Sequence, residues 1–362
     1  MKRTTLLKLA LALAALAAAP STARAQCSSE FSTTLVKYYE TEYELPPFAQ
    51  RDETAESICS IRTEGGRRIC TVRLWGALHQ PDSDLMFPKF STLIFNHGSE
   101  ETFTAKGKYC RVAKYFVPKG YAVFVPFRRG QGDSDHADGN RRSSGRYIED
   151  VVDDFTNNPN GHNTTCPAGA GACYRAQLLK LEADEEVARA VRYLTVTREL
   201  VVKESDGDYK LAVAGNSYGG SVTVFFNRKA HGQKAVMPFA AAAENWDKVN
   251  FDYAAQGWDI SFPDSVLGAL LSAAKNAKRP AFYLQAKWDY DTRSTIDLAY
   301  AHAYGSSDPT HGDKFMASIF PYRKFLFQNG EIDYQSAHAG FADATDVWGA
   351  SVLAFLKLYN VD

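Results

Sequence analysis

The sequence predicts an α/β fold in which helices cover both faces of a mostly parallel sheet. Short apolar runs alternate with longer segments of helical periodicity, several of these runs are apolar at nearly every position, and a glycine-rich turn joins one of them to a helix. Strands that are buried on both faces have this continuous apolar character. The expected strands span Ile69–Leu74, Thr92–Asn96, Ala122–Pro126, Lys210–Ala214, Ala235–Phe239, Ala281–Gln285 and Lys324–Phe327.

The chain begins with a segment that is typical of an export signal. Met1-Lys2-Arg3 is basic, an apolar run follows, and Ala23-Arg24-Ala25 has the small-x-small pattern of a cleavage site. We expect residues 1–25 to be a cleavable signal peptide and the mature protein to be secreted or periplasmic. A retained membrane anchor is the weaker alternative, because the apolar run is shorter than the roughly 20 residues that span a bilayer. A lipid-modified Cys27 is a second weak alternative.

The charge of the chain excludes some classes of partner. The formal net charge is −1, and it becomes −5 without the signal segment, which holds four basic residues and no acid. A mildly acidic chain without basic runs is a poor candidate for binding nucleic acid or an anionic membrane. No later stretch is apolar enough to span a membrane, so the mature form is not expected to insert into one.

All six cysteines lie after the expected cleavage site, and an even number in an exported chain favours disulfides. One pair flanks an expected hairpin turn at Thr63-Glu64-Gly65-Gly66, and another brackets a short loop. The expected pairs are Cys59 with Cys70, Cys166 with Cys173 and, by elimination, Cys27 with Cys110. A metal site formed by His162, Cys166 and Cys173 is the alternative, but it lacks a second ligand pair, so no metal is expected.

Residues 133–174 interrupt the alternation after the third expected strand. The stretch is rich in Asp, Asn, Gly, Arg and Ser, and it is much longer than an ordinary connection. We interpret it as a lid or a binding insertion, and a surface loop without fixed structure is the alternative. No repeat or linker divides the rest of the chain, so residues 26–362 are predicted to form a single domain.

Two segments show helical periodicity with one apolar face. The first, Arg175–Val196, is expected to bury Leu178, Leu181, Val187, Val191 and Leu194, with Glu182, Asp184, Glu185, Glu186 and Arg189 on the polar positions. The second, Asp343–Leu358, is expected to bury Val347, Ala350, Val352, Phe355 and Leu358.

The strongest chemical signal is the segment Gly215-Asn216-Ser217-Tyr218-Gly219-Gly220, between the apolar run Lys210–Ala214 and a helix expected from Ser221. In a G-x-S-x-G turn of this kind the serine lies on a strained strand-to-helix corner. It stands at the amino end of the helix, where negative charge is stabilised. The context predicts the α/β-hydrolase fold with Ser217 as the nucleophile, and a merely structural turn is the alternative.

A serine hydroxyl is a weak nucleophile and needs a base that a carboxylate orients. In the α/β-hydrolase fold the order along the chain is serine, acid, histidine. Of the eight histidines, His338 alone follows the last expected strand, so it is predicted to be the base. The acid is expected after the strand Ala281–Gln285, where Asp289 and Asp291 both lie. We favour Asp289 because it is closer to the strand end.

The oxyanion of a tetrahedral intermediate needs two preorganised N–H donors. One candidate is the backbone N–H of Tyr218, directly after the nucleophile. The other is the backbone N–H of Ser99, in the loop His97-Gly98-Ser99-Glu100 that follows the second expected strand. His97 itself is interpreted as a residue that fixes this loop rather than as the catalytic base.

Several motifs form an ordered set along the chain. They are Asn96-His97-Gly98, Arg128-Arg129-Gly130-Gln131-Gly132-Asp133-Ser134, the turn at Ser217, Met237-Pro238-Phe239 with Asn245-Trp246, Gln285-Ala286-Lys287-Trp288-Asp289-Tyr290 and His338-Ala339-Gly340-Phe341. Together they resemble the dienelactone hydrolase-like branch of the α/β-hydrolases, over roughly Arg68 to Leu358.

This resemblance implies a serine esterase without a metal or organic cofactor, and it favours Asp289 as the acid. The chain departs from the family pattern in two places. Members named for dienelactone cleavage use a cysteine nucleophile where this chain has Ser217, so that substrate is not implied. Ala286 also replaces the glycine that is usual before the acid.

The sequence as a whole predicts an exported serine hydrolase that cleaves a small-molecule carboxylic ester through an acyl-enzyme intermediate. Trp246, Trp288 and Tyr290 are candidates for binding the substrate. Arg128 and Arg129 either bind a substrate carboxylate or brace nearby loops, as the resemblance implies. A serine peptidase acting on short peptides or acyl-amino acids is the nearest alternative. A hydrolase-fold binding protein without activity is another, and the intact set of serine, histidine and aspartate argues against it.

Overall fold

The structure is a computed structural model, and it describes part of the chain. The described residues are 31–44, 60–86, 88–98, 109–128, 176, 179–180, 182–241, 264–287, 289, 292–305, 315–320, 338 and 340–362. The expected signal peptide, 1–25, and the expected insertion, 133–174, lie outside them and stay predictions.

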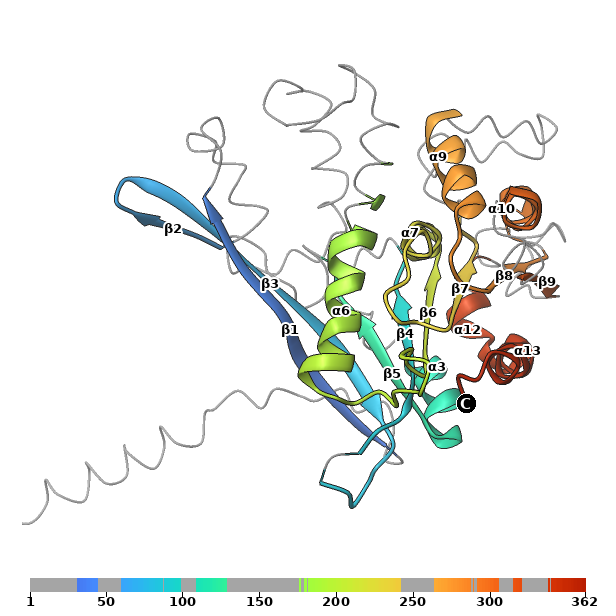
Figure 1. The fold of residues 1–362 in the computed structure, drawn as a ribbon, viewed down its shortest axis with the longest axis horizontal. Helices are drawn as coiled ribbons and strands as arrows, with labels where there is room; N and C mark the ends of the chain where they lie inside the picture. The colour runs from blue at the N-terminus through green and yellow to red at the C-terminus, as the bar shows by residue number, and fades with distance from the viewer. Residues whose placement is uncertain are drawn as a thin grey trace, which may run out of the picture.

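Among the described residues, nine strands form one sheet at the centre of the molecule (Figure 1). Its order is β1-β3-β5-β4-β6-β7-β8-β9, with β2 paired to β3 beside this path. The strands from β5 to β9 run parallel, whereas β1, β2 and β5 are antiparallel to β3. The bounds are β1 Ser32–Glu44, β2 Ser60–Glu64, β3 Arg67–Gln80, β4 Ser91–Asn96, β5 Tyr121–Pro126, β6 Leu211–Asn216, β7 Ala235–Phe239, β8 Ala281–Ala286 and β9 Phe315–Phe320.

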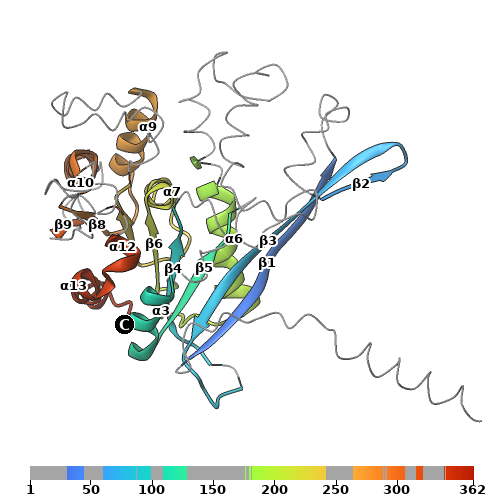
Figure 2. The same cartoon turned by 180° about the vertical axis from the view of Figure 1, so that it is seen from behind.

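Helices cover both faces of this sheet. Successive strand residues point to opposite faces: Ile94 packs into one hydrophobic cluster, and Leu93 and Phe95 pack into the other. In the first cluster, α6 Ala188–Arg192 is continuous with two π-helices, η4 Glu182–Val187 and η5 Tyr193–Thr197. The other helices of this cluster are α7 Tyr218–Phe226, α9 Asp264–Lys275 and α10 Thr292–Gly305. Those of the second are α3 Cys110–Phe116, continued by the 3₁₀ turn η2 Val117–Lys119, α12 Gly340–Asp343 and α13 Thr345–Leu358. Figure 2 shows α7, α9 and α10 toward the top and α3 and α13 toward the bottom.

This architecture confirms the predicted α/β class, and every expected strand but the last is present. The strand beside β8 is β9, which was not expected, and the expected strand Lys324–Phe327 lies outside the described residues. Both segments are short and apolar, and periodicity alone does not rank two such neighbouring runs.

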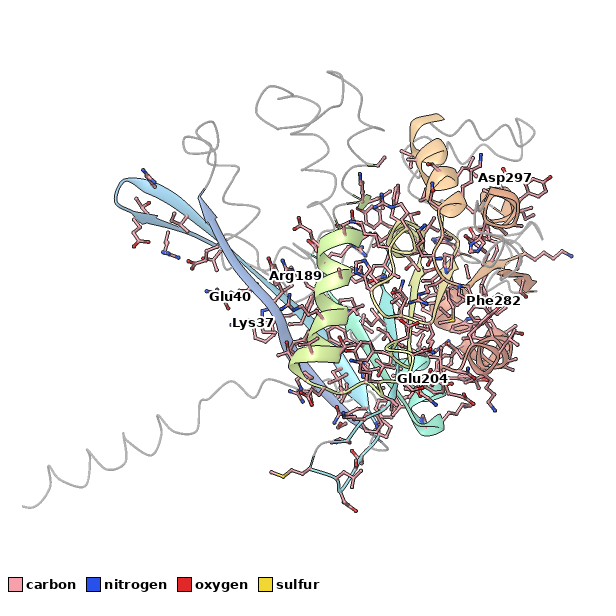
Figure 3. All side chains as sticks on the ribbon, viewed as in Figure 1. Lys37, Glu40, Arg189, Glu204, Phe282 and Asp297 are labelled. Atoms are coloured by element: carbon pink, nitrogen blue, oxygen red, sulfur yellow. The ribbon has the colours of Figure 1, made fainter. Side chains whose placement is uncertain are left out.

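The antiparallel strand β1 was not expected from the sequence either. Its pairing with β3 shifts register between Lys37 and Tyr39, and such a bulge breaks the two-residue period by which a strand is recognised. With β2 and β3 it forms a ribbon that extends beyond the parallel strands (Figure 1). The ribbon turns at Gly65 and Gly66, with φ of 58° and 81°, which confirms the expected hairpin. In Figure 3 Arg189 of α6 faces this ribbon, and its guanidinium lies 5.0 Å from the centre of the Tyr39 ring.

The helix expected over Arg175–Val196 is confirmed in its described part, but two of its polar positions are not exposed. Val187, Val191 and Leu194 are buried as expected. Glu182 and Glu186 are buried as well, at 1% and 4% exposure, so their assignment to the polar face was wrong. The physical reason is a buried cation: Nε of Arg128 lies 3.6 Å from Oε2 of Glu182.

The buried face of α13 also differs from the expected one. Val352 and Phe355 are buried as expected, but Val347, Ala350 and Leu358 are exposed, Val347 and Leu358 at 44% and 65%. Trp348 is buried instead, stacked on Phe341 at 5.5 Å between ring centroids. Burying the largest apolar ring removes the most area from water, and this sets the rotation of the helix. Among the described residues no helix could cross a membrane.

Candidate active site

Ser217 lies in a strained backbone conformation between β6 and α7. Its φ is 57° and its ψ is −124°, a combination that residues with a Cβ rarely adopt. The corner is held from both sides, because the Ser217 N–H donates to the Phe239 carbonyl at 2.9 Å and the Ser217 carbonyl accepts from the Ser221 N–H at 3.1 Å. This is the geometry of a nucleophile elbow. At the end of a central parallel strand, it completes the α/β-hydrolase fold predicted from the sequence.

The glycines of the elbow allow α7 to pack directly on backbone. A Cβ on Gly215 would lie 2.0 Å from the Gly219 carbonyl oxygen. A Cβ on Gly219 would lie 2.2 Å from the carbonyl oxygen of Asn96 in β4, and one on Gly220 would lie 2.5 Å from that of Phe239 in β7. Each distance is far below a van der Waals contact, so these positions exclude any side chain.

His338 and Asp289 form a buried hydrogen-bonded pair. Nδ1 of His338 and Oδ2 of Asp289 are 2.8 Å apart, and the two side chains are 9% and 2% exposed. A carboxylate only accepts, so Nδ1 carries the proton and donates it. Nε2 of the neutral imidazole is then left as the nitrogen that can accept a proton. The structure therefore brings together the predicted base and the preferred acid.

The elbow and this pair lie at the same edge of the sheet. Ser217 follows β6 and Asp289 follows β8, and parallel strands present their carboxyl ends on one side. The segment after His338 returns to the same place, because the Phe341 ring packs on Phe239 at 4.3 Å between centroids. Phe239 also holds the Ser217 N–H through its carbonyl.

His302, another histidine that follows Ser217 in the chain, is part of the core. His302 is fully buried in α10, and its Nδ1 lies 3.2 Å from the Tyr283 hydroxyl in β8. Its position agrees with the choice of His338. His311 lies outside the described residues.

The loop after β4 approaches Ser217 through a glycine. A Cβ on Gly98 would lie 3.3 Å from the Ser217 Cβ, so the loop backbone passes directly beside the serine. The Gly98 N–H donates to the Tyr109 hydroxyl at 3.2 Å. His97 is buried, and its Nδ1 lies 2.8 Å from the Gly98 carbonyl oxygen, as expected for a residue that fixes the loop.

The predicted oxyanion donors are described in part. Tyr218 is the first residue of α7, and the N–H of a first helical residue has no acceptor within the helix. Ser99, the other predicted donor, lies outside the described residues. So do Asp291 and the three predicted substrate-binding residues, Trp246, Trp288 and Tyr290, and these assignments stay predictions.

Arg128 braces the loop beside the elbow, which was one of its two expected roles, but its buried pairing with Glu182 was not foreseen. Arg128 reaches the carbonyl oxygens of His97 and Gly98, pairs with Glu182, and lies over the Tyr218 ring at 4.7 Å to the centroid. Burial and then the Glu182 charge raise the pKa of the Tyr218 phenol well above its ordinary value. The doubled arginine was the only signal in the sequence, and nothing local linked it to Glu182.

Metal binding and disulfides are tested only in the part of the chain that the structure describes. There, no group of histidine, cysteine, aspartate and glutamate side chains could hold a metal ion, and no cysteine is a free thiol. The expected disulfide pairing stays a prediction, because Cys27, Cys59, Cys166 and Cys173 lie outside the described residues.

No protein-family model and no curated protein matches the sequence. Solved structures similar to this one include an esterase of Pyrococcus furiosus, at 12% identity over 89% of this chain and 93% of that one, with a TM-score of 0.46. An S-formylglutathione hydrolase of Staphylococcus aureus matches at 14% identity over 88% and 97%, with a TM-score of 0.42. A dienelactone hydrolase of Anabaena variabilis matches at 14% identity over 81% and 97%, with a TM-score of 0.41. Similarities at this level carry no argument about activity, and the fold rests on the topology and the elbow described above.

Proposed function

We propose that this chain, an α/β-hydrolase by fold, is an exported serine hydrolase that cleaves small-molecule carboxylic esters. The observation that carries the proposal is the buried hydrogen bond between His338 and Asp289, at the sheet edge where the elbow presents Ser217. A nucleophile, a base and a carboxylate that orients the base are the parts that acyl transfer by a serine requires.

In the proposed reaction the Ser217 Oγ attacks the ester carbonyl carbon while its proton passes to Nε2 of His338. Asp289 holds Nδ1–H and stabilises the imidazolium that forms. The tetrahedral intermediate collapses to an acyl-enzyme, and the alcohol leaves with the proton from Nε2. Water then attacks the acyl group, His338 again accepts and returns a proton, and the carboxylic acid is released.

The developing oxyanion needs donors that are in place before the reaction. We assign this role to the backbone N–H groups of Tyr218 and Ser99. The amino end of α7 adds a favourable dipole at the same point. We also assign Trp246, Trp288 and Tyr290 to the substrate pocket.

Two alternatives predict different outcomes with the same protein. A serine peptidase would use the same residues but cleave short peptides or acyl-amino acids faster than the corresponding esters. A binding protein with the hydrolase fold would cleave neither. The strained backbone at Ser217 favours an enzyme, because a conformation that costs about 1–3 kcal/mol is needed to present a nucleophile and is not needed for binding.

The experiment compares the mature protein with Ser217→Ala on matched 4-nitrophenyl esters and 4-nitroanilides. We expect ester turnover, and a loss of about 10⁶-fold in kcat for Ser217→Ala. Asp289→Asn should lose about 10⁴-fold, whereas Asp291→Asn should stay close to wild type. Undiminished ester cleavage by Ser217→Ala would refute the nucleophile, and a larger loss at Asp291 than at Asp289 would reverse the choice of acid.

A further inference from the structure

The Arg128 guanidinium is bound by backbone rather than presented to a substrate. Its side chain is 6% exposed. Nη1 donates to the His97 carbonyl oxygen, and Nη2 donates to the Gly98 carbonyl oxygen at 2.6 Å. Both terminal nitrogens therefore hold the loop that passes beside Ser217. With both nitrogens engaged in this way, the guanidinium is unsuited to binding a substrate carboxylate.

The loop that Arg128 holds lies directly beside Ser217. A Cβ on Gly98 would lie 3.3 Å from the Ser217 Cβ. A guanidinium that holds the carbonyl oxygens of His97 and Gly98 therefore fixes the backbone next to the proposed nucleophile.

The same cation contacts Tyr218, whose backbone N–H is a proposed oxyanion donor. It lies over the Tyr218 ring at 4.7 Å to the centroid. Tyr218 is 1% exposed. A cation on the face of a buried ring is a favourable contact, so Arg128 fixes the side chain at the start of α7 as well as the loop after β4.

A second set of contacts keeps the charge of Arg128 in place. Glu182 is 1% exposed and its Oε2 lies 3.6 Å from Nε of Arg128. The Arg128 backbone N–H points to Nε2 of His97 at 3.4 Å. With Nε2 as the acceptor, Nδ1 of His97 is the donor to the Gly98 carbonyl oxygen.

We propose that Arg128 is a positioning residue that holds the loop after β4 and Tyr218 in place beside Ser217, with Glu182 as the counter-charge that keeps it buried. The proposal rests on the proposed serine hydrolase function. Arg128 acts through the backbone that it holds rather than on the substrate, and its effect therefore belongs to the transition state rather than to substrate binding.

Arg128→Lys tests this role with the positive charge kept. A lysine ammonium is a point donor and does not reproduce the planar fork that reaches two carbonyls. We expect a loss of about 10²-fold in kcat, as for the loss of one oxyanion donor, with KM changed less than about threefold. The affinity for a trifluoromethyl ketone, which forms a tetrahedral adduct with the serine, should fall by the same factor. The affinity for the matching methyl ketone should not change.

Two further variants control for folding. Arg128→Met with Glu182→Gln removes both buried charges together, so no unpaired charge is left, and it should show the same loss in kcat. Arg279→Lys alters another partly buried ion pair, with Asp208 at 2.7 Å, at the amino ends of β6 and β8 and away from the site. It should leave kcat unchanged. All rates are referred to the folded fraction, measured by near-ultraviolet circular dichroism.

The outcomes separate the two proposals. If wild type cleaves esters, Ser217→Ala does not, and folded Arg128→Lys or the double variant keeps full kcat and ketone affinity, the positioning role is wrong and the hydrolase function stands. A loss confined to KM would also overturn it, because it would place Arg128 in substrate binding. If Ser217→Ala keeps the activity, the proposed function itself fails.

Discussion

Replacing Ser217 with glycine should stabilise the folded protein while removing its proposed activity. The serine is held at φ 57° and ψ −124° by hydrogen bonds to its N–H and its carbonyl. Glycine adopts positive φ without a steric penalty. Ser217→Ala lacks the same hydroxyl but keeps the Cβ, so the difference between the two variants isolates the strain of the corner.

The magnitude follows from two opposing terms. Relief of the strained conformation contributes about 1–3 kcal/mol in favour of the glycine variant. The greater freedom of glycine in the unfolded chain costs about 0.5–1 kcal/mol. The difference in the free energy of unfolding should therefore be about 1 kcal/mol, with Ser217→Gly the more stable.

Urea unfolding followed by circular dichroism measures this difference. With an m-value of about 3 kcal/mol per molar, 1 kcal/mol shifts the midpoint by roughly 0.3 M. Both variants should lose turnover of 4-nitrophenyl esters equally. The reasoning is refuted if Ser217→Gly unfolds at the same or a lower urea concentration than Ser217→Ala.

Two further predictions concern the sheet and its edges. Burial lowers the pKa of His79 from 6.5 to about 4. As the pH falls, the unfolded chain therefore takes up this proton before the folded protein does. The free energy of unfolding decreases between pH 6.5 and 4 for this reason, by up to about 3 kcal/mol. His79→Gln, which stays neutral, should lose about 2 kcal/mol less stability than wild type between pH 7 and pH 4.5 in urea unfolding, and equal losses would contradict the assignment. Gly215→Ala places a Cβ 2.0 Å from the Gly219 carbonyl oxygen and should destabilise the fold by about 3 kcal/mol or more. Gly268→Ala, on α9 with no atom within 4 Å of the added Cβ, is the matched control and should gain about 0.5–1 kcal/mol from helix propensity; a comparable loss at both glycines would rule out the clash at Gly215.

Features that depend on neighbouring residues in the chain could be predicted without the structure. The parallel strands β4, β5, β6, β7 and β8 were recognised because burial on both faces makes them apolar throughout. The elbow was recognised because a strand, a serine between glycines and a helix follow one another directly. Asp289 and His338 were chosen by their order after later strands, and the structure places them 2.8 Å apart.

The strand β1 and the buried face of α13 were not predicted correctly from the sequence. β1 was missed because its bulge interrupts the two-residue period. The face that α13 buries was misjudged, because an alternative stripe containing Val347 and Leu358 fitted the same period. Packing of Trp348 against Phe341 decided between the two stripes, and that contact depends on where α12 lies.

The sequence by itself determined the strands from β5 to β8 of the sheet, the elbow and the order of the three proposed catalytic residues, since each of these follows from a local pattern. Only the tertiary structure decided that Glu182 lies inside the protein beside Arg128. A helical pattern places a carboxylate on the polar face because an unpaired charge is costly to bury. That cost is offset here by Arg128, a cation in the distant loop after β5. No local pattern in the sequence indicates which distant cation a carboxylate will contact.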